Sequence, residues 1–383
     1  MKIVLSGVET NNKGAELMLY AILQEIERKW PDAEVYIPPM RVKQGVSYIK
    51  TGLCVRYTSS LLTNTMVGKL HLRGVFEKFH LPMSLFAKMD IIQNADWFID
   101  GSGFVFGDQF NLTDGYVEEW RIKLKMLKEN GCKVVFLPQA IGPVEKPITK
   151  RALAVLSEYS SIIMPREHIS YNYLKQSGIV DMNKIKLFTD FTSLVEGKFP
   201  SGYEHLKNGI CIIPNRQMIN KGVLLYKDYV KLLSLIIGKA RQSGLPVYLL
   251  NHEGKKDEQL AFRCVESLDY DIEVVSGLNA LEVKGLIASA YMVITSRFHG
   301  LASALNSCVP CLATSWSHKY KELLNDYNTT DCILPLDNND AAIKMVEDFL
   351  CRRRNDEMRE HLKNQIPRIK EENRKMWNYV WNL

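Results

Sequence analysis

The stretch from Tyr291 to Gly300 constrains the fold more than any other part of the chain. Its first five residues, Tyr-Met-Val-Ile-Thr, are apolar and rich in β-branched side chains, which is typical of a buried parallel strand. Ser-Arg-Phe-His-Gly follows, and a small-residue helix begins at once. Arg297 and His299 are therefore predicted at the carboxyl end of a strand, which is the ligand-binding edge of an open α/β sheet.

The chemistry of these two residues suits an anionic ligand. The planar guanidinium of Arg297 matches a carboxylate or a phosphate, and the free N–H groups of a helix start also favour an anion. His299 can move a proton near neutral pH. The alternative interpretation is an exposed loop arginine beside a histidine that caps the helix.

The same order of strand, polar loop and helix recurs along the whole chain, which predicts parallel sheets. The expected strands are 2–6, 34–37, 96–100, 133–138, 161–165, 186–189, 209–214, 246–250, 272–275, 291–295 and 311–314. The expected helices are 17–30, 61–79, 85–93, 117–130, 150–158, 170–176, 226–243, 258–267, 280–288 and 340–350, followed by a long polar helical tail.

A polar segment with glycine and proline, Glu196–Gly202, interrupts this alternation before it restarts. We predict an N-terminal α/β domain at 1–195, a C-terminal α/β domain at 196–350, and a helical tail at 351–383 that packs back on the first domain. Two Rossmann-like domains facing across a cleft, with a C-terminal helix, describe the GT-B architecture.

The composition agrees with a two-domain α/β enzyme and limits the kinds of ligand that it is expected to bind. At 383 residues the chain is long enough for two cores. It is 46% hydrophobic and 24% charged, as in soluble enzymes, and its net charge of +6 suits anionic substrates or an anionic membrane surface. There is no basic and aromatic block typical of nucleic-acid binding. The eight cysteines lack paired spacing apart from Cys308 and Cys311, so no metal is expected.

Further polar residues follow the other expected strands. The N-terminal loop contains Asn12-Lys13-Gly14-Ala15-Glu16, and later strand ends carry Asp100-Gly101-Ser102-Gly103, Gln139, Arg166, Asp190, His252 with Asp257, and Lys319. Each motif is short, but their order and spacing together are specific.

With these motifs, and with Leu137–Pro143, Arg166–Ser170 and Ser296–Gly300, the chain resembles the polysaccharide pyruvyl transferase family over nearly its whole length. It departs from the family pattern at Ala15, where an acid is common, and at Ser102, where a third glycine is common. Both positions lie on the expected acceptor side.

The resemblance implies transfer of a pyruvyl group from phosphoenolpyruvate to two hydroxyls of one sugar, with formation of a cyclic ketal. His299 would be the acid, with His252 as second choice; Asp190, Glu16 and Asp100 are unranked candidates for the base. The expected donor-binding residues are Arg166, Arg297, Phe298, Gly300 and Lys319. The expected acceptor-binding residues are Asn12, Gly14, Glu16, Asp100, Gly101, Gly103 and Gln139. No cofactor and no metal are expected, and phosphoenolpyruvate is the co-substrate.

Two other functions remain open at this point. The same Arg297 and His299 could hold the diphosphate of a nucleotide sugar in a GT-B glycosyltransferase, or the chain could be a non-catalytic protein of the polysaccharide pathway. The expected acceptor is a sugar or a lipid-linked oligosaccharide. The start of the chain reads as a strand rather than a signal peptide, which predicts a cytoplasmic protein, with peripheral contact to the inner face of the membrane as an alternative.

Overall fold

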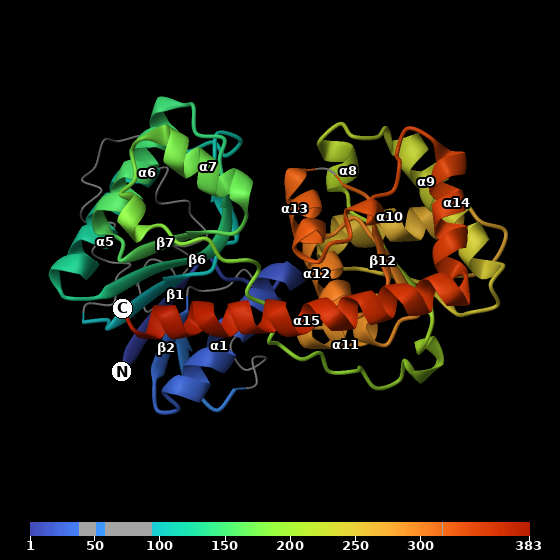
Figure 1. Ribbon diagram of the computed structural model, residues 1–383, viewed down its shortest axis with the longest axis horizontal. Coiled ribbons are helices and arrows are strands. Elements are labelled where there is room, and N and C mark those ends of the chain that lie inside the picture. Colours follow the sequence, from blue (N-terminus) through green and yellow to red (C-terminus); the bar gives the residue numbers. More distant parts are fainter. Residues whose placement is uncertain (38–50, 58–93, 316) are drawn as a thin grey trace. The chain divides into compact units, whose positions relative to one another are not determined.

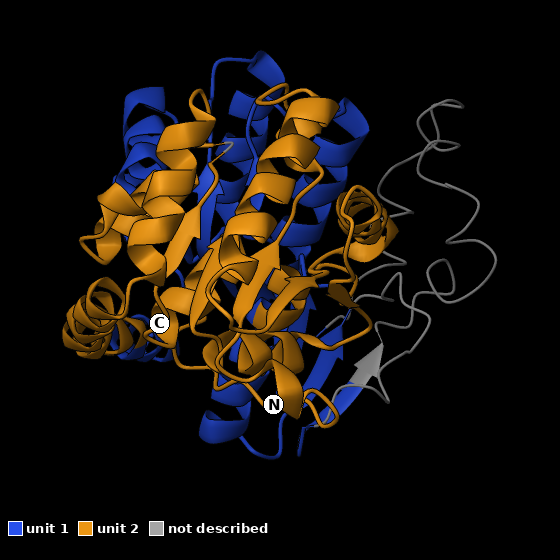
Figure 2. Cartoon of the chain, turned by 90° about the vertical axis from the view of Figure 1, so that its right-hand side faces the viewer, with its two compact units in different colours: residues 1–9, 18–191, 374–383 blue, residues 10–17, 192–373 orange. Residues whose placement is uncertain are grey.

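The computed structural model of the chain describes residues 1–37, 51–57, 94–315 and 317–383, so the helices expected at 61–79 and 85–93 lie outside the described residues. The chain divides into two compact units, drawn in separate colours in Figure 2. Unit 1 comprises Met1–Glu9, Met18–Phe191 and Arg374–Leu383. Unit 2 comprises Thr10–Leu17 and Thr192–Asn373.

Unit 1 contains a parallel sheet that begins at the first residues of the chain. Its strands are β1 (Lys2–Ser6), β2 (Glu34–Ile37), β3 (Cys54–Tyr57), β4 (Trp97–Asp100), β5 (Phe104–Phe106), β6 (Lys133–Ile141) and β7 (Ile162–Pro165). The order is β3-β2-β1-β4-β6-β5, and β7 pairs with the other side of β6. Every pairing is parallel.

Helices cover both faces of this sheet, as Figure 1 shows. They are α1 (Lys13–Lys29), α5 (Asp114–Glu129), α6 (Pro147–Tyr159) and α7 (His168–Ser177), with a short 3-10 turn at Met182–Lys184. α5 and α6 bury Leu124 and Leu153 against Phe136 of β6. Near the chain's end, Trp381 packs edge-on against Trp30, with ring centroids 4.8 Å apart, inside unit 1.

Unit 2 is a second doubly wound sheet. Its strands are β8 (Ile210–Ile213), β9 (Val247–Leu250), β10 (Glu273–Val275), β11 (Met292–Thr295) and β12 (Cys311–Ala313), in the order β10-β9-β8-β11-β12 and all parallel. Its helices are α8 (Gln217–Asn220), α9 (Tyr226–Arg241), α10 (Gly254–Glu266), α11 (Ala280–Ala288), α12 (Phe298–Asn306), α13 (His318–Asp326), α14 (Asn339–Leu350) and most of α15 (Arg352–Trp381). Short 3-10 turns lie at Glu204–Leu206 and Thr330–Cys332.

The strand order reverses between β8 and β11, which are neighbours in the sheet but far apart in the chain. All four residues of both strands are buried, as expected for an apolar parallel strand that is covered on two faces. Their carboxyl ends flank a topological switch point, where ligands bind in open α/β sheets.

Two local expectations need correction, and some elements were not expected. The segment 186–189 is not a strand: it follows β7 through two long hydrogen bonds of 3.3 Å, from Lys186 N and Phe188 N. The first helix begins at Lys13 rather than at residue 17, because the side-chain oxygen of Asn12 accepts the backbone N–H of Gly14 at 2.8 Å. The strands β3 and β5 and the helices α8 and α13 were not expected from the sequence.

Candidate active site in unit 2

A buried hydrogen-bond network supports the loop after β11. The backbone oxygen of Ser296 accepts the amide of Asn215 at 2.7 Å and the hydroxyl of Tyr320 at 2.7 Å. The Ser296 hydroxyl lies 2.6 Å from the Tyr229 hydroxyl, which in turn accepts the backbone N–H of Asn215 at 3.1 Å. These residues come from the ends of β8 and β11 and from α9 and α13, so four elements fix the loop in place.

Arg297 follows this loop and is held by two carboxylates from the start of α10. Its Nε donates to Asp257 Oδ2 at 2.8 Å, and its two terminal nitrogens contact Asp257 and Glu253. Burial lowers the pKa of Arg297 to about 10, so the guanidinium keeps its charge at neutral pH. The oxyanion grip expected of Arg297 is thus occupied by protein groups in this structure.

The two carboxylates differ in accessibility. The side chain of Asp257 is 2% exposed and also accepts the backbone N–H of Arg216 at 2.9 Å, whereas the side chain of Glu253 is 34% exposed. An anionic ligand would therefore compete with Glu253 for the guanidinium, while Asp257 continues to orient it.

This difference predicts unequal effects on stability. Asp257→Asn removes the charge beside a buried guanidinium and should lower the free energy of unfolding by about 3 kcal/mol. Glu253→Gln, the matched control on the exposed side, should cost less than about 1 kcal/mol. Urea unfolding followed by circular dichroism measures both. Equal destabilisation by the two variants would contradict the assignment of Asp257 as the fixed partner.

The segment Thr10–Leu17, which ends the loop after β1 and begins α1, belongs to unit 2 and lies beside His252 and His299; it is called the Asn12 loop below. Asn12 forms an antiparallel bridge with Glu253, and the backbone N–H of Lys13 donates to the backbone oxygen of His252 at 3.3 Å. A Cβ added to Gly14 would lie 2.2 Å from Nδ1 of His299. The sequence placed these loop residues in the first domain with the acceptor; the structure places them around the two histidines.

His252 is 3% exposed, and Nδ1 has no hydrogen-bond partner among the described residues. Burial holds its pKa well below the usual range, and the nearby charges of Arg297, His299 and Lys13 act in the same direction. The imidazole is therefore neutral near pH 7. A neutral imidazole is not the form that supplies an acidic proton, which weighs against His252 as the general acid.

Glu16 is the candidate base that lies in this unit. It is fully buried, and Oε2 pairs with Nζ of Lys13 at 2.7 Å. Burial raises the pKa of this carboxyl, and the Lys13 charge opposes the rise. A carboxylate with a raised pKa is a stronger proton acceptor than an exposed one, so the environment of Glu16 suits a base.

The remaining donor-side residues lie at the start of α12 and α13. The ammonium of Lys319 lies 5.6 Å from the ring centre of Phe298, which is within range of a cation–π contact. A Cβ at Gly300 would lie 2.7 Å from the hydroxyl oxygen of Thr295, so this first turn of α12 has no room for a side chain.

The other expected site residues group at the carboxyl edge of the unit 1 sheet. Asp100 ends β4 fully buried, and burial raises its pKa. Gln139 in β6 is also fully buried, and within the described ranges neither atom of its side-chain amide has a partner. The guanidinium of Arg166 lies 3.7 Å from Asp190 Oδ2.

Gly101 and Gly103 have a packing role in this edge. A Cβ at Gly101 would lie 2.8 Å from the side chain of Ile22, and one at Gly103 would lie 2.9 Å from the side chain of Met18. Both glycines thus make room for α1, in addition to any approach to a ligand.

One known protein family matches most of this chain. The model of the polysaccharide pyruvyl transferase family matches residues 12–318, from the Asn12 loop to the start of α13. The chain belongs to this family. The matched region of this pyruvyl transferase includes residues of both units.

Solved structures support the fold. Anabaena HepE in complex with UDP and glucose shows 11% identity and a TM-score of 0.61, covering 100% of each chain. A glycosyltransferase from Rickettsia africae shows 11% identity and a TM-score of 0.59, and the match covers 99% of this chain and 98% of that protein's chain. The UDP-GlcNAc 2-epimerase of Methanocaldococcus jannaschii shows 15% identity and a TM-score of 0.54, and the match covers 93% of this chain and 94% of the epimerase chain. The pyruvyl transferase accordingly has a GT-B-like α/β fold. A search of curated proteins gave no match.

Three contributors to this site were absent from the predicted set. Lys13, Glu253 and Asp257 surround Arg297, His252 and Glu16, but none was expected to bind donor or acceptor. The sequence does contain a signal for the pair Glu253 and Asp257. Residues four apart at a helix start lie on the same face of the helix, and a buried arginine needs a negatively charged partner. What the sequence does not reveal is which arginine that face meets.

Proposed function

We propose that this enzyme transfers a pyruvyl group from phosphoenolpyruvate to two hydroxyls of one sugar in a polysaccharide precursor. The family match over residues 12–318 is the observation that carries the proposal. The grouping of Arg297, His299 and the Asn12 loop in one unit supports it, because a small anionic donor needs cations and a proton source close together.

The reaction balances without a further reagent. A proton adds to the CH₂ carbon of phosphoenolpyruvate, and the positive charge that develops on C2 accepts the oxygen of one sugar hydroxyl. The C2–O bond to phosphate then breaks, and the second hydroxyl attacks C2 to close the ketal. Of the two hydroxyl protons, one replaces the proton given to the CH₂ carbon and the other leaves with phosphate.

We assign His299 as the acid that protonates the CH₂ carbon. A phosphate bound beside the ring would favour its protonated form. Glu16 is our choice for the base, because it is the candidate carboxylate that lies in the same unit as His299. Arg297 and Lys319 bind the donor's anionic groups in this proposal, with Glu253 displaced when the donor enters.

The acceptor is proposed to be a sugar or lipid-linked oligosaccharide that contacts Asp100 and Gln139. Their buried, incompletely bonded polar atoms suit sugar hydroxyls. Arg166 remains a proposed donor ligand. Over the described residues, no helix is both long and apolar enough to cross a membrane. We propose a cytoplasmic enzyme, with contact to the inner face of the membrane where the acceptor is lipid-linked.

Thermal unfolding with added ligand tests the donor. At a hundredfold excess over Kd, phosphoenolpyruvate should stabilise the folded enzyme by about 2.7 kcal/mol, which raises Tm by several degrees. UDP-glucose should leave Tm unchanged. A rise with UDP-glucose alone would favour the nucleotide-sugar glycosyltransferase, and no response to either would favour a non-catalytic pathway protein. Release of phosphate together with a ketal-bearing product completes the test.

Arg297→Lys tests the donor clamp. Lysine keeps one charge but removes the planar fork, so we expect phosphoenolpyruvate to bind at least about tenfold more weakly. The control is Arg241→Lys, also in unit 2, whose guanidinium stacks on Tyr270 at 3.9 Å. Isothermal titration measures both. Binding by Arg297→Lys as tight as that of the parent would show that Arg297 does not hold the donor.

A further inference from the structure

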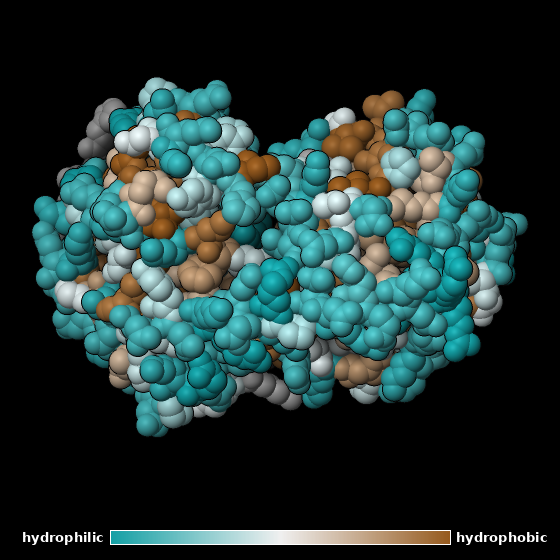
Figure 3. Space-filling view, in the orientation of Figure 1, coloured by the Kyte–Doolittle hydropathy of each residue, from teal (hydrophilic) through white to brown (hydrophobic). Residues whose placement is uncertain are grey.

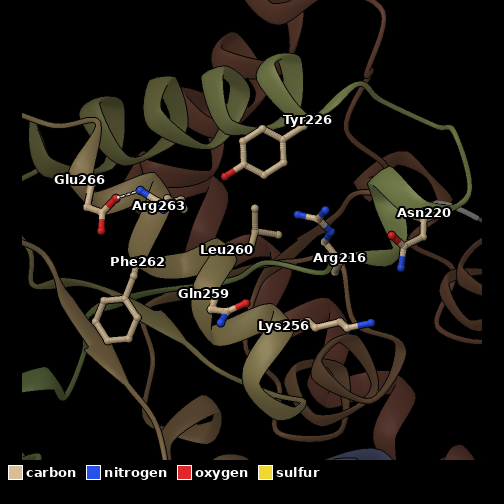
Figure 4. Close-up of a pocket in the computed structure, with 9 residues that line it drawn as sticks. All are labelled: Arg216, Asn220, Tyr226, Lys256, Gln259, Leu260, Phe262, Arg263 and Glu266. Atoms are coloured by element: carbon tan, nitrogen blue, oxygen red, sulfur yellow. Dashed lines mark hydrogen bonds and ion pairs between the residues drawn. The ribbon is translucent and has the colours of Figure 1, made fainter.

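A pocket in unit 2 lies along one face of α10. It has a volume of about 640 Å³ and is bounded by α8, the start of α9 and α10 (Figure 4). Residues of α10 at 256, 259, 263 and 266 line it, which is the spacing of one helix face. Glu253 and Asp257, which hold Arg297, are not among the lining residues.

The lining carries a surplus of positive charge. Three cationic side chains, Arg216, Lys256 and Arg263, stand against one carboxylate, that of Glu266. Glu266 already pairs with Arg263 at 2.7 Å. Two positive charges, on Arg216 and Lys256, therefore remain for a ligand, and the guanidinium of Arg216 is oriented by the ring of Tyr226 at 5.3 Å.

The same pocket offers aromatic rings and amides. Tyr226 is 40% exposed and Phe262 is 48% exposed, and both are among the large apolar side chains that the protein leaves open to solvent. Hydrophobic residues also gather over α8 and the segment leading to α9 on the face shown in Figure 3. Asn220 and Gln259 supply amide donors and acceptors, which hydroxyl groups need.

We propose that this pocket binds an acidic saccharide, meaning a sugar that bears a carboxylate or a phosphate. The rings would cover the apolar faces of the sugar, the amides would bond its hydroxyls, and Arg216 with Lys256 would pair with the anionic group. The anion has two sources: a carboxylated sugar unit of the polymer, or the phosphate of a linking group. The inference goes beyond the proposed function, and the binding itself does not depend on it.

The experiment is isothermal titration of the full chain with three probes. These are a galacturonic acid tetramer, the neutral glucose tetramer maltotetraose, and glucose 1-phosphate. We expect at least one acidic probe to bind about tenfold or more tightly than maltotetraose, because charge-assisted hydrogen bonds are the strong ones. Tighter binding of the tetramer identifies the carboxylate as the source of the anion, and tighter binding of the phosphate identifies the linking group.

Variants locate the binding. Arg216→Gln combined with Lys256→Gln should weaken the acidic probe about tenfold or more. Phe262→Ala should weaken the tetramer as well. Lys255→Gln, which changes an exposed lysine on the same helix outside the pocket lining, is the matched control and should bind like the parent.

The inference is overturned if neither acidic probe binds, if maltotetraose binds equally well, or if the double variant binds like the parent. Phosphoenolpyruvate is titrated into the same proteins and should bind the parent and the double variant alike. If the acidic probe binds while phosphoenolpyruvate does not, the proposed function fails and the pocket stands.

Discussion

Replacing His299 by asparagine is expected to lower turnover by about 10²–10⁴-fold while affinity for phosphoenolpyruvate changes much less. The size is what a well-placed general acid contributes. Asparagine keeps a hydrogen-bonding group near the imidazole position but cannot give a proton to carbon. The substitution therefore separates proton transfer from binding more cleanly than alanine would.

The measurement pairs pyruvylation of a simple pyranoside, followed by phosphate release, with titration of the donor. His361→Asn is the control: this histidine lies in α15 and bonds the backbone oxygen of Tyr327 at 2.8 Å, within unit 2. Its turnover should equal that of the parent. If His299→Asn turns over normally, or fails because the donor no longer binds, His299 is not the acid.

The sequence predicted helices and strands well where the apolar residues of a segment and its backbone hydrogen bonds favour the same structure. The strands β1 and β2 and the helix α11 begin and end at the expected residues, because runs of β-branched residues and an N-cap asparagine leave few alternatives. The segment 186–189 contains two large apolar residues and a threonine but makes only two long backbone hydrogen bonds to β7 and the residue that ends it. The composition of a segment indicates its propensity for the strand conformation. Whether it forms a strand also depends on the hydrogen bonds that it makes with an adjacent strand.

The placement of Arg297 was predicted for a similar reason. Arg297 lies at the end of β11 because a buried apolar strand must end where polar residues begin, and that is visible in one sequence. Its partners come from the start of α10, the helix that follows β9, two strands away in the sheet. Strand order is a property of the folded chain, so the ion pair with Asp257 could not be derived from spacing.

The Asn12 loop shows a second limit. Its residues follow β1, so chain order assigns them to the first domain, yet they pack in unit 2 against His252 and His299. The helix was expected from residue 17, so the capping of α1 by Asn12 was missed, although asparagine is a common N-cap residue. The surface that the capped turn meets could not be predicted, because contacts between distant segments leave no trace in local periodicity.

Gly14→Ala is expected to lower turnover by about 10²-fold while the enzyme remains folded. The added Cβ would lie 2.2 Å from Nδ1 and 2.7 Å from Cγ of His299, so the ring must move. Displacement of a catalytic group by about 1 Å can cost 10²-fold. Gly14 lies in the first turn of α1 without a positive φ, so alanine suits the backbone and favours the helix.

Gly238→Ala is the control within the same unit. Gly238 lies in α9, and its Cβ would come no closer than 3.6 Å to the hydroxyl of Tyr270, which is ordinary contact. Turnover of this variant should match the parent. Thermal unfolding should show that both alanine variants are folded at the assay temperature. A Gly14→Ala enzyme with normal turnover would mean that the observed position of the His299 ring is not the working one.

The double variant Gly14→Ala with His299→Asn decides how the two effects are related. If alanine acts only by displacing the imidazole, it has nothing left to displace once the acid is gone, and the double variant should turn over like His299→Asn alone. Independent effects would instead multiply, giving a further loss of about 10²-fold. Non-additivity therefore assigns the contact between the Asn12 loop and His299 to catalysis, because a purely structural role of Gly14 would weaken both backgrounds equally.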